Sequence, residues 1–509
     1  MSFCRKLREN LNDHMTGKKA LIVGAGLGGL ATALRLRRRG YEVEMVEMYR
    51  QAGGRLNQLT SGGFTFDMAP TFFSMSYHFN EFVRDAGIEM PFRFVQIDPL
   101  YRVNFRGSNR WYTIYRDLDR LAGQFEDIEP GFRDRMERFL VSSGVLFDDI
   151  EKGVLAKNFR SLPDFMMQMT KLPVKHVPKV MRSVWSEMSR YFTSYEVRVI
   201  YSLVSFFLGA TPFDTPAVYT ILSYTEMVHD GYHNVEGGMY RIVEGLLREA
   251  EKAGIKINYN VTIKDFDGSG IRNRAFIDTD GRRWEGDIFV VNADAAMFRG
   301  RVFRRPAFTD GKLDRMQWTL APFTMYLGVK GKMDNIHHHN YFLGDGDYEP
   351  YSRGIFRNKV SLEKPYYYVN ANAIFNPQSA PAGCENLFIL VPVPDLRFKP
   401  DWSDRERIAD AVIKDLSART GHNIEANLMT RVVLDPVDWQ NMFGLWRGSG
   451  LGLGHKMTQV GGFRPSNRDE VFSNVWYTGA STVPGTGLPM VIISSKLTVQ
   501  RIENEAGSL

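Results

Sequence analysis

A group of glycines near the start of the 509-residue chain has the residue types and spacing needed to bind a nucleotide. Gly24, Gly26 and Gly29 form the pattern G-x-G-x-x-G, and a further glycine, Gly28, lies within it. In such a pattern the first glycine permits a tight turn, the second lets the backbone approach a pyrophosphate, and the third allows close packing of the helix that follows. Glu47 comes later and can accept hydrogen bonds from ribose hydroxyls. The pattern predicts a dinucleotide site, and the alternative is a tight turn without a ligand.

The elements around these residues must form a strand, a turn, a helix and a second strand. Residues 20–23 are an apolar run, and apolar side chains recur at helical spacing after the glycines. Four arginines followed by Gly40 mark the end of that helix, as the helix dipole and C-cap chemistry favour. Residues 41–47 are expected to form the next strand, which ends in Glu47. This βαβ context makes the glycine pattern a specific signal.

A second glycine-rich segment bears on which nucleotide is bound. Gly53, Gly54 and Arg55 follow Glu47 after five intervening residues. They resemble the second glycine-rich segment of flavoproteins of the glutathione-reductase and amine-oxidase type. The resemblance implies an FAD site, in which unhindered backbone and one guanidinium approach the diphosphate and the flavin. The alternative is a solvated loop with a surface arginine, and the βαβ pattern by itself leaves both FAD and NAD open.

Composition limits the class of protein. Apolar residues make up 44% and charged residues 24% of the chain, as in ordinary globular proteins. The net charge of +6 fits either an anionic partner such as lipid headgroups or ordinary surface composition, and nothing indicates a nucleic acid partner. The two cysteines, Cys4 and Cys384, exclude a disulfide framework and a four-cysteine metal site, and they fit a reducing cytoplasmic setting. No run of about 18 apolar residues occurs, so a membrane span is not expected.

Longer motifs resemble those of one enzyme family. Residues 63–71, GFTFDMAPT, resemble a GFxFDxGPT motif, with Ala69 in place of the usual glycine. Residues 463–469 and 476–490 match the patterns FRPxNRD and GAxTxPGxGxP. These are the motifs of the bacterial and fungal carotenoid or phytoene desaturases, in the FAD-dependent amine-oxidase-like superfamily. Because alanine resists positive φ, Ala69 raises a question about the backbone at that position.

The resemblance implies an FAD-dependent oxidoreductase acting on CH–CH groups, with phytoene desaturase as the leading interpretation. Such an enzyme inserts C=C bonds into a long-chain polyene hydrocarbon by hydride transfer to flavin, and oxygen or a quinone is the final electron acceptor. Loss of hydride beside a polyene leaves a delocalised allylic cation, so a strong protein base is not obligatory, and no catalytic residue is assigned. Close alternatives are a C30 diapophytoene desaturase, a hydroxycarotenoid 3,4-desaturase, a carotenoid oxidase and a saturase. A flavin amine oxidase and a non-catalytic flavoprotein are more distant alternatives.

The expected fold is α/β, with a Rossmann-like FAD-binding domain of the glutathione-reductase or amine-oxidase type interleaved with a substrate domain of mixed sheet and helices. Residues 1–17 are expected to be a flexible leader. Residues 105–229 are expected to form a helical segment that faces substrate and membrane, and residues 301–430 the sheet of the substrate domain. The FAD-binding domain is expected to be discontinuous, over residues 18–104, 230–300 and 431–509.

The family resemblance also assigns residues to the cofactor. It places the backbone of Val261 beside the adenine, and an ordinary strand valine is the alternative. A strand ending at Gly479, a loop rich in glycine and proline, and a helix over residues 490–503 would direct N–H groups and a positive helix end at the flavin. The flavin-facing residues implied in this segment are Gly479, Ala480, Gly487, Pro489 and Met490.

One segment of the middle region predicts a membrane contact. Residues 163–192 combine methionine and aromatic side chains with lysine and arginine, which suits insertion of an apolar face among anionic headgroups. Packing on its own domain is the alternative. We expect an otherwise cytoplasmic protein that associates peripherally with membranes, because a membrane-dissolved substrate must be drawn from the bilayer. The three histidines at 337–339 are not expected to bind a metal, since consecutive strand residues point to alternate faces.

Overall fold

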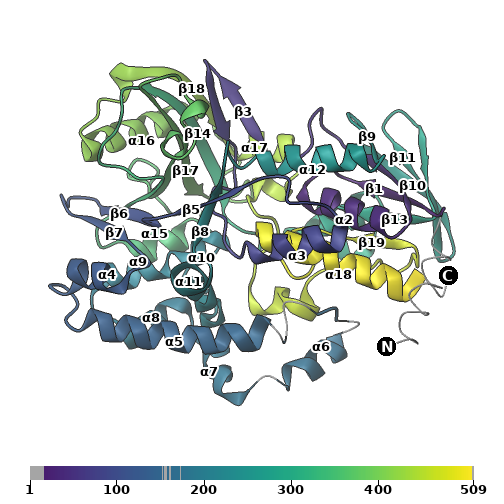
Figure 1. The fold of residues 1–509 in the computed structure, drawn as a ribbon, viewed down its shortest axis with the longest axis horizontal. Helices are drawn as coiled ribbons and strands as arrows, with labels where there is room; N and C mark the ends of the chain where they lie inside the picture. The colour runs from purple at the N-terminus through teal and green to yellow at the C-terminus, as the bar shows by residue number, and fades with distance from the viewer. Residues whose placement is uncertain (1–16, 152, 154–156, 160–161, 172, 507–509) are drawn as a thin grey trace.

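Two β-sheets organise the molecule (Figure 1). The structure is a computed structural model and describes residues 17–151, 153, 157–159, 162–171 and 173–506. Apart from Gly17, the predicted leader lies outside the described residues, as does Cys4. One sheet has five strands and adjoins the glycine motif, and the other has seven strands. Together with the helices that cover them, the sheets confirm the expected α/β class.

The five-stranded sheet has the order β19-β13-β1-β2-β9, and every neighbouring pair of strands is parallel. Its central strands are mostly buried because other elements cover both faces of the sheet. Strands from distant parts of the chain therefore lie side by side in one nucleotide-binding type of sheet. The five strands are β1 (Lys19–Val23), β2 (Glu42–Val46), β9 (Lys256–Asn258), β13 (Ile288–Val291) and β19 (Val475–Tyr477).

Helices cover one face of this sheet and a small antiparallel sheet covers the other. On the helical face, Leu30 and Leu34 share a buried core with Val290 and Trp476. On the opposite face, Trp284 packs in a core with strand residues of the five-stranded sheet. The covering elements are α2 (Leu27–Arg38), α3 (Tyr77–Ala86), α12 (Arg241–Lys252) and α18 (Leu488–Ala506) on one side, and β10 (Ile263–Ser269), β11 (Arg272–Asp278) and β12 (Arg283–Glu285) on the other.

The seven-stranded sheet has the order β18-β14-β17-β16-β15-β6-β7. Its pairs are antiparallel except for β15 with β6, which are parallel. Helix α16 (Arg405–Thr420) shares one buried core with the sheet, and a larger core that includes the middle helices contacts it elsewhere. The strands are β6 (Tyr101–Phe105), β7 (Trp111–Ile114), β14 (Ala321–Lys330), β15 (His339–Leu343), β16 (Tyr367–Ala371), β17 (Cys384–Val393) and β18 (Leu428–Leu434).

Two strand positions differ from the predicted domain boundaries. The hairpin of β6 and β7 pairs with β15, so it belongs to the seven-stranded sheet although the predicted boundary at 104/105 runs through it. Strand β18 pairs with β14 and crosses the predicted boundary at 430/431. Both differences arise because long-range strand pairing decides sheet membership, and local sequence does not carry that information.

The middle region is helical after β7, as the sequence predicts. The last helix runs directly into a five-residue π-helix, η4 (Thr225–His229), a form that is rare and frequent at functional sites. The helices are α4 (Leu118–Phe125), α5 (Phe132–Ile150), α6 (Leu162–Met169), α7 (Val177–Met181), α8 (Val184–Tyr191), α9 (Tyr195–Ser202), α10 (Val204–Phe207) and α11 (Ile221–Tyr224).

Helices α6 and α7 carry an unusual amount of exposed apolar surface. They project at the lower edge of the molecule in Figure 1. One lysine of the segment predicted to contact the membrane is not available to lipid. Lys179 is buried, donates to the Ser142 carbonyl and lies 3.9 Å from the Glu187 carboxylate. The exposed apolar side chains here are Leu162 (42%), Met166 (51%), Met167 (56%), Val177 (54%) and Met181 (81%).

A short hairpin connects the two sheets through a buried carboxyl. The hairpin pairs β3 (Gln58–Ser61) with β4 (Phe64–Asp67). At its end Asp67 accepts hydrogen bonds from the backbone N–H groups of Met239 and Tyr240, just before α12, and from the Asn372 amide. Burial raises the pKa of Asp67 to about 6, and these hydrogen bonds oppose the rise. Ala69, two residues on, does not have positive φ, so alanine fits there without strain.

Candidate functional site

The two glycine-rich segments predicted to hold the cofactor are in direct contact. Gly26 and Gly53 form an isolated parallel bridge, and the Gly53 N–H donates to the Ala25 carbonyl at 2.9 Å. A Cβ on Gly54 would lie 3.6 Å from the Cα of Gly26. Gly53 and Gly54 both have positive φ, which favours glycine. The close approach leaves Gly26, Gly54 and Arg55 partly exposed along one edge.

An asparagine that sequence reasoning did not assign holds these turns together. Asn292 directly follows β13, and its Nδ2 donates to the Gly24 carbonyl at 3.2 Å. A Cβ on Gly28 would lie 2.6 Å from its Oδ1, and a Cβ on Gly479 would lie 2.5 Å from the same atom. The available signal was its position at the carboxyl end of a parallel strand, where α/β sheets bind ligands.

Gly24 and Gly29 explain the sharpness of the first turn. Gly24 has φ of +97°, a conformation that other residues rarely adopt. A Cβ on Gly29 would lie 2.1 Å from the Gly24 carbonyl oxygen, so only glycine fits there. Helix α2 begins at Leu27, and its N-cap Gly26 contributes no side-chain hydrogen bond. The first N–H groups of the helix are therefore suited to an anionic group such as a diphosphate.

Glu47 lies where the sequence places it, at the carboxyl end of β2. Its carboxylate accepts hydrogen bonds from the N–H of Ala25 at 2.6 Å and from the N–H of Tyr49 at 3.0 Å. Burial raises the pKa of Glu47, and the surrounding backbone N–H groups oppose that rise. A carboxylate has further acceptor capacity after these two bonds, which a ribose hydroxyl could use.

The structure places Val261 next to Glu47, with its backbone N–H already bonded. That N–H donates to the Glu47 carbonyl at 2.8 Å, and the Glu47 N–H donates to the Asn258 carbonyl. Strand β9 ends at Asn258, so Val261 lies beyond the strand and is not the ordinary strand valine of the alternative interpretation. Of the two backbone groups of Val261, the carbonyl is therefore the one that an adenine amino group could use.

Two arginines face one carboxylate between the glycine segments and the C-terminal loop. Arg55 donates to the Gly450 carbonyl at 3.1 Å, and the negative charge of Asp294 opposes the lowering of its pKa by burial. Asp294 caps helix α13 (Ala295–Arg301) by accepting from the N–H groups of the first turn. Arg464 is the second cation near Asp294, and burial lowers its pKa to about 10. The excess of positive charge suits an anionic cofactor.

Arg464 fixes the predicted flavin-facing loop through hydrogen bonds to the backbone carbonyls of that loop. Its guanidinium donates to the carbonyls of Ala480 at 2.8 Å and Thr482 at 2.9 Å, and also to three carbonyls of residues 453–459. Its side chain is 3% exposed and no carboxylate is hydrogen-bonded to it among the described residues. The loop is therefore fixed by charge-assisted hydrogen bonds to one buried cation.

The predicted C-terminal residues lie around the start of α18. Gly479 follows β19 by two residues, and its N–H donates to the Ser494 hydroxyl at 3.0 Å. The helix begins at Leu488 and ends at Ala506, whereas the sequence predicts residues 490–503. Gly487 precedes the helix with φ of +115°, so Pro489 and Met490 lie in its first turn. All three are partly or fully exposed.

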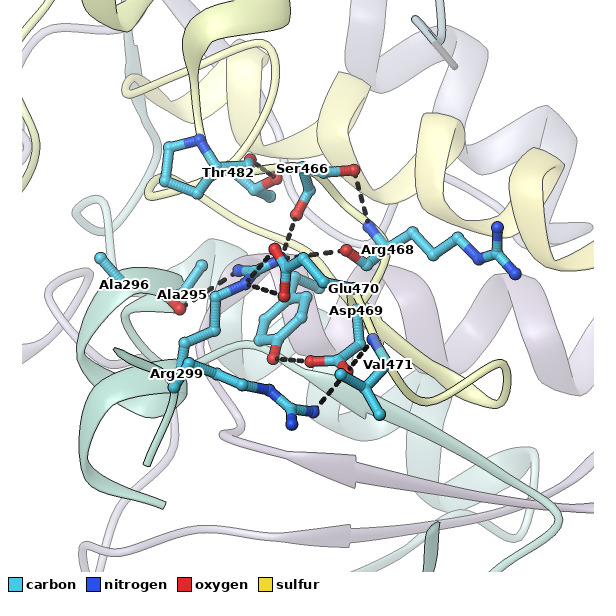
Figure 2. Close-up of polar contacts among 12 residues, drawn as sticks. Ala295, Ala296, Arg299, Ser466, Arg468, Asp469, Glu470, Val471 and Thr482 are labelled. Atoms are coloured by element: carbon cyan, nitrogen blue, oxygen red, sulfur yellow. Dashed lines mark hydrogen bonds and ion pairs between the residues drawn. The ribbon is translucent and has the colours of Figure 1, made fainter. Parts of the chain in front are cut away.

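A second arginine anchors the segment that leads into this loop (Figure 2). Arg299 of α13 donates to the carbonyls of Ser466 and Arg468 and forms an ion pair with Glu470 at 2.8 Å. In the same cluster Asp469 accepts from Arg305 and from the hydroxyl of Tyr477, a residue of β19. These contacts fix β19 and α13, and hence Gly479 and Asp294, relative to each other.

The residues present fit a dinucleotide with a flavin at the C-terminal loop. The uncapped helix α2 and the two glycine segments form a side-chain-free cradle, Glu47 lies at the ribose end, and the two cations lie near the loop. Among the described residues no three His, Cys, Asp or Glu side chains gather in a way that could hold a metal ion. His338 and His339 instead contact the Ala371 carbonyl and the Tyr368 hydroxyl.

Comparison with protein families matches residues 27–503 to the flavin-containing amine oxidoreductases. The chain is 33% identical to the ζ-carotene-forming phytoene desaturase of Myxococcus xanthus, over 96% of this chain and 94% of that protein. It is 27% identical to the phytoene desaturase of Fusarium fujikuroi, over 96% of this chain and 90% of that protein.

Solved structures with this fold share little sequence with the chain. An oxidoreductase from Methanosarcina mazei superposes with a TM-score of 0.63 at 16% identity, covering 95% of this chain and all of that one. A putrescine oxidase bound to putrescine superposes with a TM-score of 0.66 at 13% identity, covering 97% of this chain and 99% of that one. At these identities the similarity establishes the fold alone.

Proposed function

Because the chain belongs to the flavin-containing amine oxidoreductase family, and within it groups with the carotenoid desaturases, we propose that it is an FAD-dependent phytoene desaturase. The protein is an oxidoreductase and its cofactor is FAD. The reaction it is proposed to catalyse removes two hydrogens from adjacent carbons of a C40 polyene and leaves a new C=C bond. The single observation that carries the proposal is the 33% identity to a phytoene desaturase along nearly the whole of both chains.

The length of the aligned region matters more here than the percentage identity. A cofactor domain alone would match many flavoproteins with unrelated substrates, because fold does not determine function. Here the aligned region also includes the helical middle region and the seven-stranded sheet, where the substrate is expected to bind. Similarity of this second part favours a substrate of the same class.

The residues proposed to hold FAD divide into three groups. Those proposed for the diphosphate and ribose are Gly24, Gly26, Gly28, Gly29, Glu47, Gly53, Gly54 and Arg55, and the Val261 carbonyl is proposed for the adenine. Those proposed for the flavin are Gly479, Ala480, Gly487, Pro489 and Met490. When bound there, FAD supplies a two-electron acceptor for the hydride.

The chain's own contribution to the reaction is position, charge and exclusion of water. Arg464 holds the Ala480 carbonyl and keeps the loop in one conformation. We expect the positive end of α18 and the two cations near Asp294 to stabilise negative charge on the reduced cofactor. Phe72, two residues after Pro70 of the GFxFDxGPT motif, presents a partly exposed ring for the polyene.

We further propose that helices α6 and α7 contact the membrane and that oxygen or a quinone reoxidises the enzyme. No helix in the described part of the chain has the length and apolar character needed to cross a bilayer. The exposed side chains of Met166, Met167 and Met181 support a peripheral contact, since apolar surface of this kind is stabilised among lipid tails. Lys171 and Lys175 are exposed in the same region and suit anionic headgroups.

Co-expression in bacteria that accumulate phytoene tests the proposed activity. Liquid chromatography of the pigments is expected to show conversion to ζ-carotene, lycopene or a neighbouring product, and the chromophore length counts the desaturation steps. Unchanged phytoene in cells that contain folded, FAD-loaded protein would contradict the proposal. Parallel strains that accumulate C30 diapophytoene or hydroxylated carotenoids then identify which related substrate is used.

A further inference from the structure

A buried carboxyl without an ion-pair partner lies in the substrate part of the molecule. Glu226 is the second residue of the π-helix η4 and is 4% exposed. Burial raises its pKa to about 8, and within the described part of the chain the Tyr232 hydroxyl alone opposes this rise. Among the described residues no lysine, arginine or histidine lowers the pKa of Glu226. Such a group is costly to retain without a role, because an unpaired buried charge destabilises a fold.

Four buried tyrosines lie within electrostatic reach of this carboxyl. The charge of Glu226 raises the pKa of Tyr101, Tyr201, Tyr232 and Tyr341, and none of the four is more than 7% exposed. In the part of the chain that is described, the hydroxyls of Tyr201 and Tyr341 have no hydrogen-bond partner. A buried hydroxyl left unpaired destabilises the fold, so this group of side chains is suited to a ligand.

Aromatic rings form a wall on one side of the same cluster. The Phe72 ring lies 4.9 Å from that of Tyr232 and 6.2 Å from that of Tyr341, and Tyr101 lies 5.5 Å from Tyr341. Phe72 is the partly exposed member of this group. Aromatic faces attract cations, and the attraction is strongest where water is excluded. The cluster thus combines one carboxyl with a wall that can stabilise positive charge.

One contact connects this region to the predicted flavin loop, and another connects it to the seven-stranded sheet. Helix α11 runs without a break into η4, and Ile221 of α11 packs in one apolar cluster with Met490 at the start of α18. On the other side, Phe72 lies two residues beyond Pro70, and its neighbour Thr71 is hydrogen-bonded to Tyr368 at 2.9 Å. The chain segments that carry Glu226 and Phe72 therefore contact the start of α18 and the seven-stranded sheet, respectively.

We propose that Glu226 accepts the proton released in the desaturation, inside a cage formed by Phe72, Tyr101, Tyr232 and Tyr341. This inference rests on the proposed desaturase function. It adds a catalytic residue that neither motif nor spacing marks, because Tyr101 and Tyr341 come from strands distant in sequence.

The step balances with FAD as the only oxidant. One C–H bond of the polyene breaks and its hydrogen leaves with both electrons as hydride to the oxidised cofactor, so that the substrate is oxidised and the cofactor reduced. The carbon left behind is an allylic cation, stabilised by the polyene, the aromatic wall and the Glu226 carboxylate. The neighbouring C–H bond then breaks, its proton goes to a Glu226 oxygen, and its electron pair becomes the new π bond.

Anaerobic single-turnover reduction of the FAD-loaded enzyme by phytoene in liposomes tests the role of Glu226. Only the ionised carboxylate can stabilise the cation and take the proton, so the rate of flavin bleaching is expected to rise with pH, about tenfold per unit from about pH 6 to pH 8. The four facing tyrosines have raised pKa values and stay neutral throughout. Phytoene itself does not titrate, so the rise reports the enzyme with its flavin, and the Glu226→Gln variant assigns it to the carboxyl.

The variants Glu226→Gln and Glu226→Asp separate chemistry from structure. Glu226→Gln is expected to slow flavin reduction by about 100-fold or more and to abolish the pH dependence, with FAD affinity unchanged. Glu226→Asp is expected to be slower than wild type but to retain the rise with pH. The matched control is Glu385→Gln in β17, which removes another buried carboxyl, 3.0 Å from Lys332, and is expected to retain the wild-type profile.

The outcomes distinguish this inference from the proposed function. If phytoene does not reduce the flavin of the wild-type enzyme, the result contradicts the desaturase proposal itself. A wild-type rate that is flat from about pH 6 to pH 9, or a Glu226→Gln variant with the wild-type rate and profile, overturns the role of Glu226 and leaves desaturation intact. If Glu226→Gln does not fold, the wild-type profile and Glu226→Asp still decide.

Discussion

At the scale of single residues, the site depends on glycines, which lack a Cβ, as much as on the side chains around them. Gly28, Gly29 and Gly479 each leave room for a backbone or amide oxygen at a distance that no Cβ could tolerate. Asn292 occupies the space that two of these glycines leave. The turn is therefore closely packed, and a side chain added at one glycine would displace the residues around the others.

Gly29→Ala is expected to abolish FAD binding and to destabilise the protein by about 3 kcal/mol or more. The new Cβ would lie 2.1 Å from the Gly24 carbonyl oxygen, and backbone must move to relieve the contact. Flavin absorbance after purification and thermal unfolding measure the two effects. The control is Gly123→Ala in α4, where a Cβ meets no atom within 4 Å and helix propensity improves by about 0.5–1 kcal/mol. Equal behaviour of the two variants would contradict the packing account.

Glu226→Gln is also expected to change how stability depends on pH. The folded pKa of about 8 lies above the ordinary value of 4.5 for a glutamate, so the folded state holds the proton more tightly and wild-type stability falls as pH rises from about 5 through 8. The amide does not titrate, so the variant escapes a penalty on the order of several kcal/mol at high pH. The difference in Tm between variant and wild type is expected to grow from about pH 5 to pH 9. A constant difference would show that burial does not raise this pKa.

At the scale of elements, buried arginines fix the segments that meet at the flavin loop. Arg299 joins α13 to the segment 466–470, and Arg464 joins the loop at 480–482 to residues 453–459. A guanidinium can serve several carbonyls at once because its donors form a planar fork. Loops without regular hydrogen bonding thereby acquire a defined shape.

Arg464→Met is expected to lower FAD affinity by about tenfold or more, because five carbonyl groups lose their donor and the loop loosens. Titration of the apoprotein with FAD measures the change, and the reduction potential of the bound flavin is expected to fall as a positive charge is removed. Arg468→Met is the matched control, since Arg468 is 42% exposed by side chain and forms a surface ion pair. An unchanged affinity in Arg464→Met would rule out the anchoring role.

At the scale of the whole molecule, the cofactor sheet and the substrate sheet are connected at several points. The chain leaves and re-enters the five-stranded sheet, and Asp67 connects the β3–β4 hairpin to the turn before α12. The exposed apolar surface of α6 and α7 lies at the lower edge of the molecule in Figure 1, and Phe165 of α6 packs against Phe463. The proposed membrane contact therefore lies beside the segment that leads into the flavin loop.

Replacement of Met167 and Met181 by serine is expected to weaken binding to anionic liposomes by about tenfold or more, since each buried methionine contributes about 1.5–3 kcal/mol. Co-sedimentation measures the bound fraction. The double variant Ile271→Ser and Val471→Ser removes exposed apolar side chains elsewhere and is expected to bind as wild type does. Equal loss in both double variants would show that the effect is not specific to these helices.

The sequence by itself determined the cofactor class and the order of the elements that bind it. Strand β1, the glycine turn, α2 and β2 were all predictable because the signals are local: apolar periodicity, positive-φ glycines and a helix terminus with cations. The family motifs at 63–71 and 476–490 were equally readable because each is a contiguous segment.

Only the tertiary structure decided what the non-local contacts created. It assigned the β6–β7 hairpin to the seven-stranded sheet, paired the Val261 N–H with the Glu47 carbonyl, buried Lys179 and brought Asn292 against five glycines. It also brought Glu226 among tyrosines from four other elements. Burial and pairing depend on residues far along the chain, and no local pattern encodes the environment that gives a single glutamate its chemistry.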